Sequence, residues 1–187
     1  MSDLRPQPAI SGMTPVSAAQ PGVHVRLIEP GMVSVLARKA KTPELIAKAK
    51  ADFGLALADA PVQSRAGTVA ALGLGPGRWL FLGASPERLA PYFTGLASLS
   101  DHSDGYAVFE ISGPEARRAL AKGVPLDLEM FQDGDAAVTS VAHIGAILWK
   151  SSPERFAVAV YCSYAASFWH WLQASAAQFG LDVENAP

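Results

Sequence analysis

Asp101-His102-Ser103-Asp104 places the residue types of an acid, a base and a nucleophile side by side. Nucleophilic catalysis needs such groups to converge on one point, whereas the side chains of adjacent residues point in different directions. No two histidines of the chain occur at the spacing of metal ligands; the four are His24, His102, His143 and His170. The sequence therefore predicts a solvated turn at residues 101–104, no catalytic residue and no metal site.

Three further motifs invite a chemical interpretation. Gly73-Leu74-Gly75-Pro76-Gly77 has the composition of a phosphate-binding loop, but it leads into the strand-like run Arg78-Trp79-Leu80-Phe81 rather than into a helix. Ser112-Gly113-Pro114 opens a helix at which an anion could bind. Cys162, the single cysteine, would be a nucleophile only if a base or a helix dipole lowered its pKa. A hairpin turn, an ordinary helix start and a buried thiol are the simpler predictions.

Aromatic residues are the remaining candidates for ligand binding. Trp79 and Trp149 could stack on a planar ligand such as a pterin, although large aromatics beside aliphatic strands usually belong to the core. We therefore expect no cofactor-binding residue in this chain.

The composition excludes several functional classes. A formal net charge of -2 and scattered basic residues do not form a nucleic-acid-binding surface. No apolar run has the length of a membrane span, and the first residues lack the order of a signal peptide. With one cysteine, the chain has no evident need of an oxidising compartment, so a cytoplasmic location is expected. Only 17% of the residues are charged, against roughly 25% in an ordinary domain, which is expected if another chain covers part of the surface.

The predicted strands and helices, which would position the candidate residues, follow a repeating order along the chain. After a predicted disordered arm, residues 1–22, the apolar and turn patterns predict a single compact region at 23–187 with two halves, about 23–101 and 102–187. Each half reads as strand, helix, strand, strand, helix, and Arg78 and Arg155 occupy corresponding places. Residues 138–149 fit either one bent strand or two. The predicted fold is α+β, with two ferredoxin-like β-α-β-β-α units and mainly antiparallel sheet.

The last predicted helix begins after a cap at Ser163 and ends at Phe179-Gly180. Phe168, Leu172 and Phe179 form a core stripe, flanked by Trp169 and Trp171. No charged residue occurs between Ser163 and Phe179, whereas a helix that faces water usually carries Lys or Glu. Either a partner or this chain's own arm and loops cover the other side. The candidate interface residues are Trp169, His170, Trp171, Ala174 and Ala177.

Between Leu74 and Leu181 a series of short motifs occurs in a characteristic order and spacing: Gly75-Pro76-Gly77-Arg78-Trp79-Leu80, Ser112-Gly113-Pro114-Glu115-Ala116, Leu120-Ala121-Lys122-Gly123, Pro125-Leu126-Asp127-Leu128, Thr139, Ile147-Leu148, and Ser163-Tyr164-Ala165-Ala166-Ser167-Phe168-Trp169-His170-Trp171-Leu172. In these motifs the chain resembles a known family, the gamma subunits of heterotetrameric sarcosine oxidase. The family is in turn similar to the folate-binding T-protein of the glycine cleavage system, whose duplicated α+β architecture agrees with the repeat.

The resemblance implies a role in sarcosine catabolism and one-carbon metabolism. The assembled enzyme would oxidatively demethylate sarcosine to glycine, giving hydrogen peroxide and formaldehyde or 5,10-methylenetetrahydrofolate. FAD, FMN, NAD, tetrahydrofolate and zinc are expected on the other subunits and none on this chain. The expected partners are the alpha, beta and delta subunits, without nucleic acid or membrane. We expect a non-catalytic subunit that supports assembly of this oxidoreductase complex and self-associates when expressed alone.

Two alternatives remain open at this stage. The chain could be an independent tetrahydrofolate-binding or one-carbon transfer module, with the pterin held between the two halves against Trp79 or Trp149. It could also be a homodimer that reuses the fold.

Overall fold

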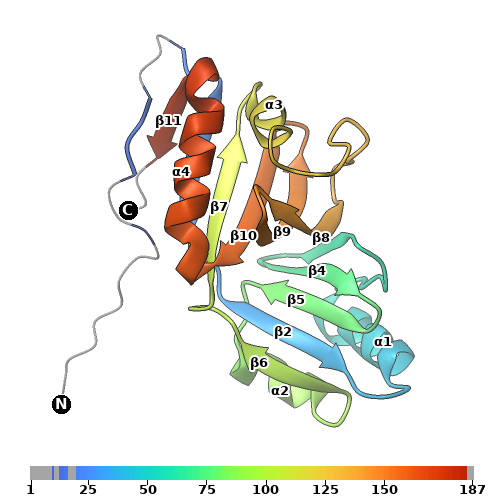
Figure 1. Cartoon of the computed structure of the whole chain (residues 1–187). Helices are drawn as coiled ribbons and strands as arrows, with labels where there is room; N and C mark the ends of the chain where they lie inside the picture. The colour runs from blue at the N-terminus through green and yellow to red at the C-terminus, as the bar shows by residue number, and fades with distance from the viewer. Residues whose placement is uncertain (1–9, 11–12, 17–19, 185–187) are drawn as a thin grey trace, which may run out of the picture.

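The computed structural model describes residue 10, residues 13–16 and residues 20–184 of the chain. This part contains eleven β-strands and four α-helices (Figure 1). None of its helices is long and apolar enough to cross a membrane. The elements follow in this order: β1 (Val23–Ile28), β2 (Met32–Ala37), α1 (Thr42–Phe53), β3 (Gln63–Ala66), β4 (Val69–Gly75), β5 (Arg78–Leu82), α2 (Pro86–Phe93), β6 (Ala97–Asp101), β7 (Tyr106–Ser112), α3 (Ala116–Leu120), β8 (Ala136–Val141), β9 (Ile144–Ser152), β10 (Arg155–Tyr161), α4 (Ala165–Ala176) and β11 (Leu181–Glu184).

The element order repeats after β1. The sequence β2-α1-β3-β4-β5-α2-β6 is matched element by element by β7-α3-β8-β9-β10-α4-β11. The first set forms a five-stranded sheet in the order β3-β4-β5-β2-β6. The second forms most of a six-stranded sheet in the order β11-β1-β7-β10-β9-β8. Each set therefore contains the ferredoxin-like arrangement, extended at one edge by β3 or β8. Arg78 and Arg155 are the first residues of the equivalent strands β5 and β10, as the repeat predicts.

Strand β1 is the exception to this repeat, because it precedes the first set but belongs to the second sheet. It lies between β7, to which it is antiparallel, and β11, to which it is parallel. A division of the chain near residue 101 therefore does not separate the two sheets. Most of the predicted N-terminal arm, residues 1–22, lies outside the described residues. Within it, Val16 pairs with Leu181, and the amide of Gly22 donates to the carbonyl of Phe179 over 2.8 Å.

The first sheet is covered on one face by α1 and α2. Helix α1 ends at Gly54, which adopts the left-handed conformation that favours glycine (φ 65°). Its N-cap is Lys41, and Thr42 is its first helical residue. Helix α2 is capped by Ser85, whose side chain accepts from the amide of Arg88. The shared core of this half includes Val35, Leu45, Leu57, Trp79, Phe81, Leu89 and Phe93.

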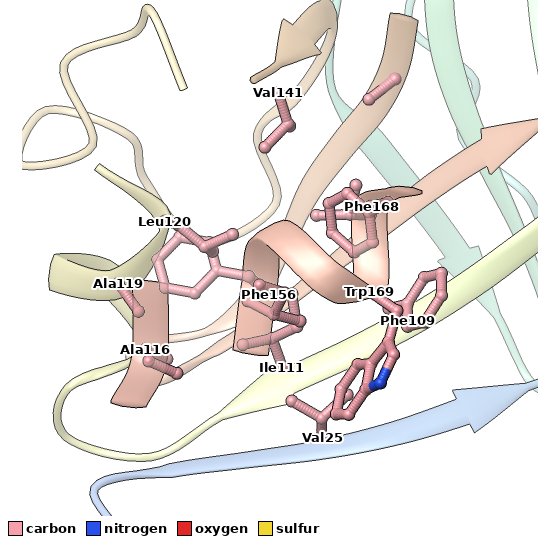
Figure 2. Packing of buried hydrophobic residues seen from close by; sticks show 14 of the residues in the cluster. Val25, Phe109, Ile111, Ala116, Ala119, Leu120, Val141, Phe156, Phe168 and Trp169 are labelled. Atoms are coloured by element: carbon pink, nitrogen blue, oxygen red, sulfur yellow. The ribbon is translucent and has the colours of Figure 1, made fainter. Parts of the chain in front are cut away.

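The second sheet is covered on one face by α3 and α4. Phe168 and Trp169 of α4 point toward Val25, Phe109, Ile111 and Phe156 of the sheet, and Leu120 approaches from α3 (Figure 2). Helix α4 is preceded by a 3-10 turn, Cys162–Tyr164, and has no side-chain cap, so Ser163 is not the N-cap that the sequence predicts. This 3-10 turn leads directly into α4, and a second 3-10 turn, Ala177–Phe179, follows the end of α4.

The opposite faces of the two sheets pack against each other. Because side chains alternate along a strand, every second residue of β4, β5, β9 and β10 reaches this inter-sheet layer. Residues from the first sheet are Met32, Ala70, Leu72, Leu80 and Leu82; those from the second are Val108, Ala136, Ile147, Trp149, Ala157 and Ala159. The fold thus has helices outside and two sheets inside, and the inter-sheet layer joins the two halves.

Candidate functional site

The Asp101–Asp104 segment forms the predicted turn between β6 and β7. The Ser103 hydroxyl donates to Asp101 Oδ1 over 2.7 Å and accepts from the amide of Met32 over 3.0 Å. Both hydrogen-bonding roles of the hydroxyl are therefore used by the turn. Hydrogen bonds from the Ser103 hydroxyl and amide lower the pKa of Asp101. The His102 ring lies against Tyr106, with ring centroids 5.9 Å apart. Nothing here forms a nucleophile and base pair.

The glycine-rich segment is the hairpin turn between β4 and β5, as predicted. The amide of Gly77 donates to Asp59 Oδ1 over 2.7 Å, so a carboxylate of this chain occupies the place a phosphate would take. An ideal Cβ on Gly73 would lie 1.9 Å from the Ala60 carbonyl oxygen, which shows how closely residues 58–60 pack on this strand. Gly73 therefore lacks a side chain because the backbone of residues 58–60 packs directly against it. The Ser112-Gly113-Pro114 motif leads into α3, which has only five residues.

The histidines lie apart, on β1, in two turns and on α4. His24 approaches Asp182 over 3.3 Å, and His143 lies in the tight turn between β8 and β9. Across residues 10, 13–16 and 20–184, no three His, Cys, Asp or Glu side chains come together as metal ligands.

Cys162 is half-buried at the start of the 3-10 turn before α4. Its Sγ donates to the Asp104 carbonyl oxygen over 3.3 Å. Burial, and secondarily the charge of Asp104, raises the pKa of the Cys162 thiol. A raised pKa is the opposite of what a nucleophilic cysteine needs.

We expect Cys162 to react slowly with a disulfide reagent at pH 7.5. Because the pKa is raised, the thiolate forms at higher pH than in an unfolded chain, and the rate should still be rising above pH 9. The measurement is the rate of thiol release against pH for the folded chain and for the same chain in denaturant. A thiol-release rate of the folded chain that levels off below pH 8 would contradict a raised pKa of Cys162.

The four tryptophans have different environments. Trp79 is 1% exposed, faces the helices of the first half and donates its Nε1 to the Ala58 carbonyl over 2.9 Å. Trp149 lies in the inter-sheet layer and is 2% exposed. Trp79 therefore offers no free ring face for a pterin. Trp169 is 7% exposed and packs in the core of the second half, so it positions α4 rather than adding to its outer surface.

The outer face of α4 is exposed and uncharged. Its buried side consists of Ala165, Phe168, Trp169, Leu172, Ser175 and Ala176. The exposed residues along and just after the helix are Ala166, Ser167, His170, Ala174, Ala177 and Gln178. We call these exposed residues, together with Trp171, the α4 face. Residues 13–16 contact this helix at its side, where Gln173 Nε2 donates to the Thr14 carbonyl and hydroxyl oxygens, each over 3.1 Å. Among the described residues, this contact leaves His170 and Ala174 exposed.

A groove of about 550 Å³ adjoins this face at Trp171. Its walls come from the end of α3 and the β8–β9 turn, and are formed by Lys122, Gly123, Val124, Pro125, Ser140, Ala142 and His143. An ideal Cβ on Gly123 would lie 2.5 Å from Trp171 Cζ2, so glycine is required for the indole to seat there. Ala142 and His143 have positive φ values, 48° and 70°, a conformation that L residues rarely adopt. The Ala142 amide donates to the Gly123 carbonyl over 3.0 Å and fixes the turn against α3.

Lys122 connects the end of α3 to the end of α4. Its ammonium donates to the Ser175 carbonyl and lies 4.9 Å from the centre of the Phe179 ring. A cation at the carboxyl end of a helix opposes the helix dipole. The inner side of α4 is therefore packed on the second sheet and on α3, while no described residue covers its outer side.

Comparison with known proteins identifies related chains. Two curated relatives, both named sarcosine oxidase subunit gamma, come from Corynebacterium strains: one from strain P-1 is 29% identical over 122 residues, and one from strain U-96 is 27% identical over 133 residues. The chain is related to sarcosine oxidase gamma subunits. The matched residues cover 60% and 67% of this chain and 59% and 65% of the two sarcosine oxidase relatives. The chain thus spans about three fifths to two thirds of their length. No protein-family model matches the chain.

Solved structures show the same fold. A chain of heterotetrameric sarcosine oxidase from Corynebacterium sp. U-96 has a TM-score of 0.74 at 22% identity, with 87% of each chain covered. Glycine cleavage system aminomethyltransferase T from Bartonella henselae has a TM-score of 0.63 at 14% identity, covering 89% of this chain and 48% of that one. The predicted α+β fold, similar to that of sarcosine oxidase and of T-protein, is confirmed.

Proposed function

We propose that this chain is a non-catalytic, gamma-type subunit of a cytoplasmic heterotetrameric sarcosine oxidase, and that it supports assembly of the complex. The observation that carries the proposal is the α4 face, which is exposed and uncharged although the helix is tightly packed on its inner side. Obligate subunit interfaces are more apolar than ordinary surface and poor in charged residues. The curated relatives are named as subunits of an enzyme, which agrees with the α4 face being an interface with another chain.

The arrangement of polar side chains supports a non-catalytic role. In the segment 101–104, the Ser103 hydroxyl makes the hydrogen bonds that hold the turn and is not paired with a base. The pKa of the Cys162 thiol is raised. In this proposal FAD, FMN, NAD, tetrahydrofolate and zinc belong to the other subunits, and the complex carries out oxidative demethylation of sarcosine. The independent tetrahydrofolate module is the weaker candidate, because Trp79 and Trp149 are both buried in the protein's own core.

Recovery of the complex from its native cells tests the proposal. A tagged chain should co-purify with a larger subunit, give a visible flavin spectrum and be active on sarcosine. A colourless chain recovered alone, with no sarcosine-dependent peroxide formation in the eluate, would contradict the proposed function. Saturable binding of tetrahydrofolate to that isolated chain would favour the one-carbon module instead.

A further inference from the structure

The inter-sheet layer is not completely filled. At one end it opens into a cavity of about 390 Å³, within the size range of small-molecule sites. We call it the inter-sheet pocket. Its floor comes from β7, β9 and β10 of the second sheet, and its roof from the β3–β4 and β1–β2 turns and the end of β5. The pocket lies on the opposite side of the second sheet from α4, and is therefore independent of the α4 face.

The floor is set by three residues in register. Ala157 of β10 pairs with Glu110 of β7 on one side and with Trp149 of β9 on the other. These three side chains are neighbours on one face of the sheet. The methyl group of Ala157 leaves a depression between the carboxylate of Glu110 and the indole of Trp149. The small central residue thus creates space between a charged and an aromatic neighbour.

The roof depends on a close backbone approach. Gly83 adopts a positive φ of 73°, and an ideal Cβ there would lie 2.4 Å from the Thr68 carbonyl oxygen. Gly83 also donates its amide to the Gly31 carbonyl over 2.8 Å. The turns that carry Thr68 and Gly31 are thereby held on the end of β5. The pocket is bounded by fixed backbone on this side, which favours a defined ligand geometry.

Two opposite charges line the pocket. Oε1 of Glu110 accepts from Arg26 over 2.8 Å and from Arg155 over 3.1 Å, whereas within the described residues Oε2 accepts no hydrogen bond. Arg65 lines the roof and makes no ion pair or hydrogen bond with any side chain that the structure describes. Counting Arg26 and Arg155 behind Glu110, the groups around the pocket are three guanidinium groups and one carboxylate. An anionic group is favoured near Arg65, and an N–H donor is favoured at Glu110 Oε2.

We propose that the inter-sheet pocket binds a small zwitterion of the amino-acid class. Its carboxylate pairs with the Arg65 guanidinium, its ammonium donates to Glu110 Oε2, and its carbon chain lies over Ala157 beside Trp149. A ligand with both charges satisfies both groups, whereas a simple anion leaves Glu110 Oε2 unused and a simple amine leaves Arg65 unused.

The test uses the full chain at low micromolar concentration with glycine and N-methylglycine as probes. Methylamine, which lacks the carboxylate, and N-acetylglycine, which lacks the ammonium, serve as matched controls. At tenfold excess over its Kd a zwitterion should raise Tm by about 3 °C, and neither control compound should. Amide resonances of Gly67, Thr68 and Gly83 should shift with the same concentration dependence, because these residues line the pocket.

Arg65→Gln is the deciding variant, since Arg65 is exposed and its side chain makes no hydrogen bond or ion pair with the described residues. It should weaken binding about tenfold or more, as expected for loss of a charge-assisted hydrogen bond. Arg38→Gln is the matched control: Arg38 is also exposed, but it follows the end of β2 remote from the pocket. Because high concentrations of amino acids stabilise proteins generally, the decisive quantity is the difference between these two variants.

Equal Tm increases in Arg65→Gln and Arg38→Gln would overturn the proposal, as would shifts of the amide resonances with methylamine alone. Binding of tetrahydrofolate to these same amides without any response to glycine would overturn it as well. These results are separate from the co-purification test, because the pocket and the α4 face lie on opposite sides of the second sheet.

Discussion

Ala174→Lys is expected to abolish recovery of the proposed sarcosine oxidase complex while leaving the chain folded. Ala174 lies on the exposed, uncharged α4 face, so a partner that covers it would have to bury an unpaired ammonium group. Leaving a charge unpaired in an interface costs several kcal/mol, which corresponds to a loss of affinity of at least about 100-fold. Lysine suits the last turn of a helix, so the free energy of unfolding should change by less than about 0.5 kcal/mol.

Ala51→Lys is the matched control for this substitution. Ala51 is also exposed and also lies in the last turn of a helix of 12 residues, but on α1 of the first half. The measurement is co-purification with the proposed flavin-containing partner, together with urea denaturation of each variant chain. Normal complex recovery with Ala174→Lys, or equal loss with Ala51→Lys, would rule out the α4 face as the interface. Ala174→Lys should also reduce self-association of the isolated chain in sedimentation experiments.

Phe168→Ala is expected to lower the free energy of unfolding by about 3–5 kcal/mol. Phe168 is fully buried, and its ring lies 4.7 Å from that of Phe109 and 5.7 Å from that of Trp171 (centroid to centroid). It is one of the core residues that anchor α4 to the second sheet (Figure 2). Since the free energy of unfolding of a small domain is only about 5–15 kcal/mol, this substitution would remove a large part of it.

Phe168→Leu and Tyr164→Ala separate the causes of this effect. Leucine fills most of the same volume, so it should cost less than about 1.5 kcal/mol. Tyr164 precedes the same helix but is 51% exposed, and its truncation should change the free energy of unfolding by about 0.5 kcal/mol or less. The measurement is the midpoint and slope of urea denaturation. A cost below 1 kcal/mol for Phe168→Ala would mean that α4 is not anchored as described.

The sequence was sufficient to predict the helices and the central strands of the fold. Helix α1 carries a proline in its first turn and is followed by a left-handed glycine, and α2 begins after a serine that caps it. These signals are local, because they depend on the backbone groups left free at a helix end. The strands of the inner layer, such as β5 and β10, are apolar on both faces, and their composition alone marks them.

Three strands were not predicted, and all three lie at a sheet edge. They are β3, β6 and β11, with the sequences QSRA, ASLSD and LDVE. Edge strands are short and bury little side-chain area, so their apolar alternation is too weak to recognise. The region at residues 138–149, which fitted one strand or two, consists of β8 and β9 joined by a turn with Ala142 and His143 at its centre. That turn lacks the usual Asn-Gly signal.

The candidate surface was predictable only in part. Absence of charge along α4 is a property of the sequence itself, so His170 and Ala174 could be named as interface candidates from the sequence, and the structure leaves both exposed. The groove beside Trp171 depends on Gly123 and on the β8–β9 turn, which no local pattern connects. Trp169 differs from its neighbour Trp171 only in its position around the helix, and the structure buries it. Likewise, the two charges of the inter-sheet pocket come from β3 and β7, in different halves of the chain.

The position of β1 has a consequence for synthesis of the chain on the ribosome. Strand β1 leaves the ribosome before the other ten strands, yet it pairs with β7 and with β11; His24 and Asp182, which contact each other, are 158 positions apart. The first sheet can close as soon as β6 emerges, whereas the second sheet stays open between β7 and β11 until the earliest strand is inserted. The second sheet can therefore be completed only after β11 has been synthesised.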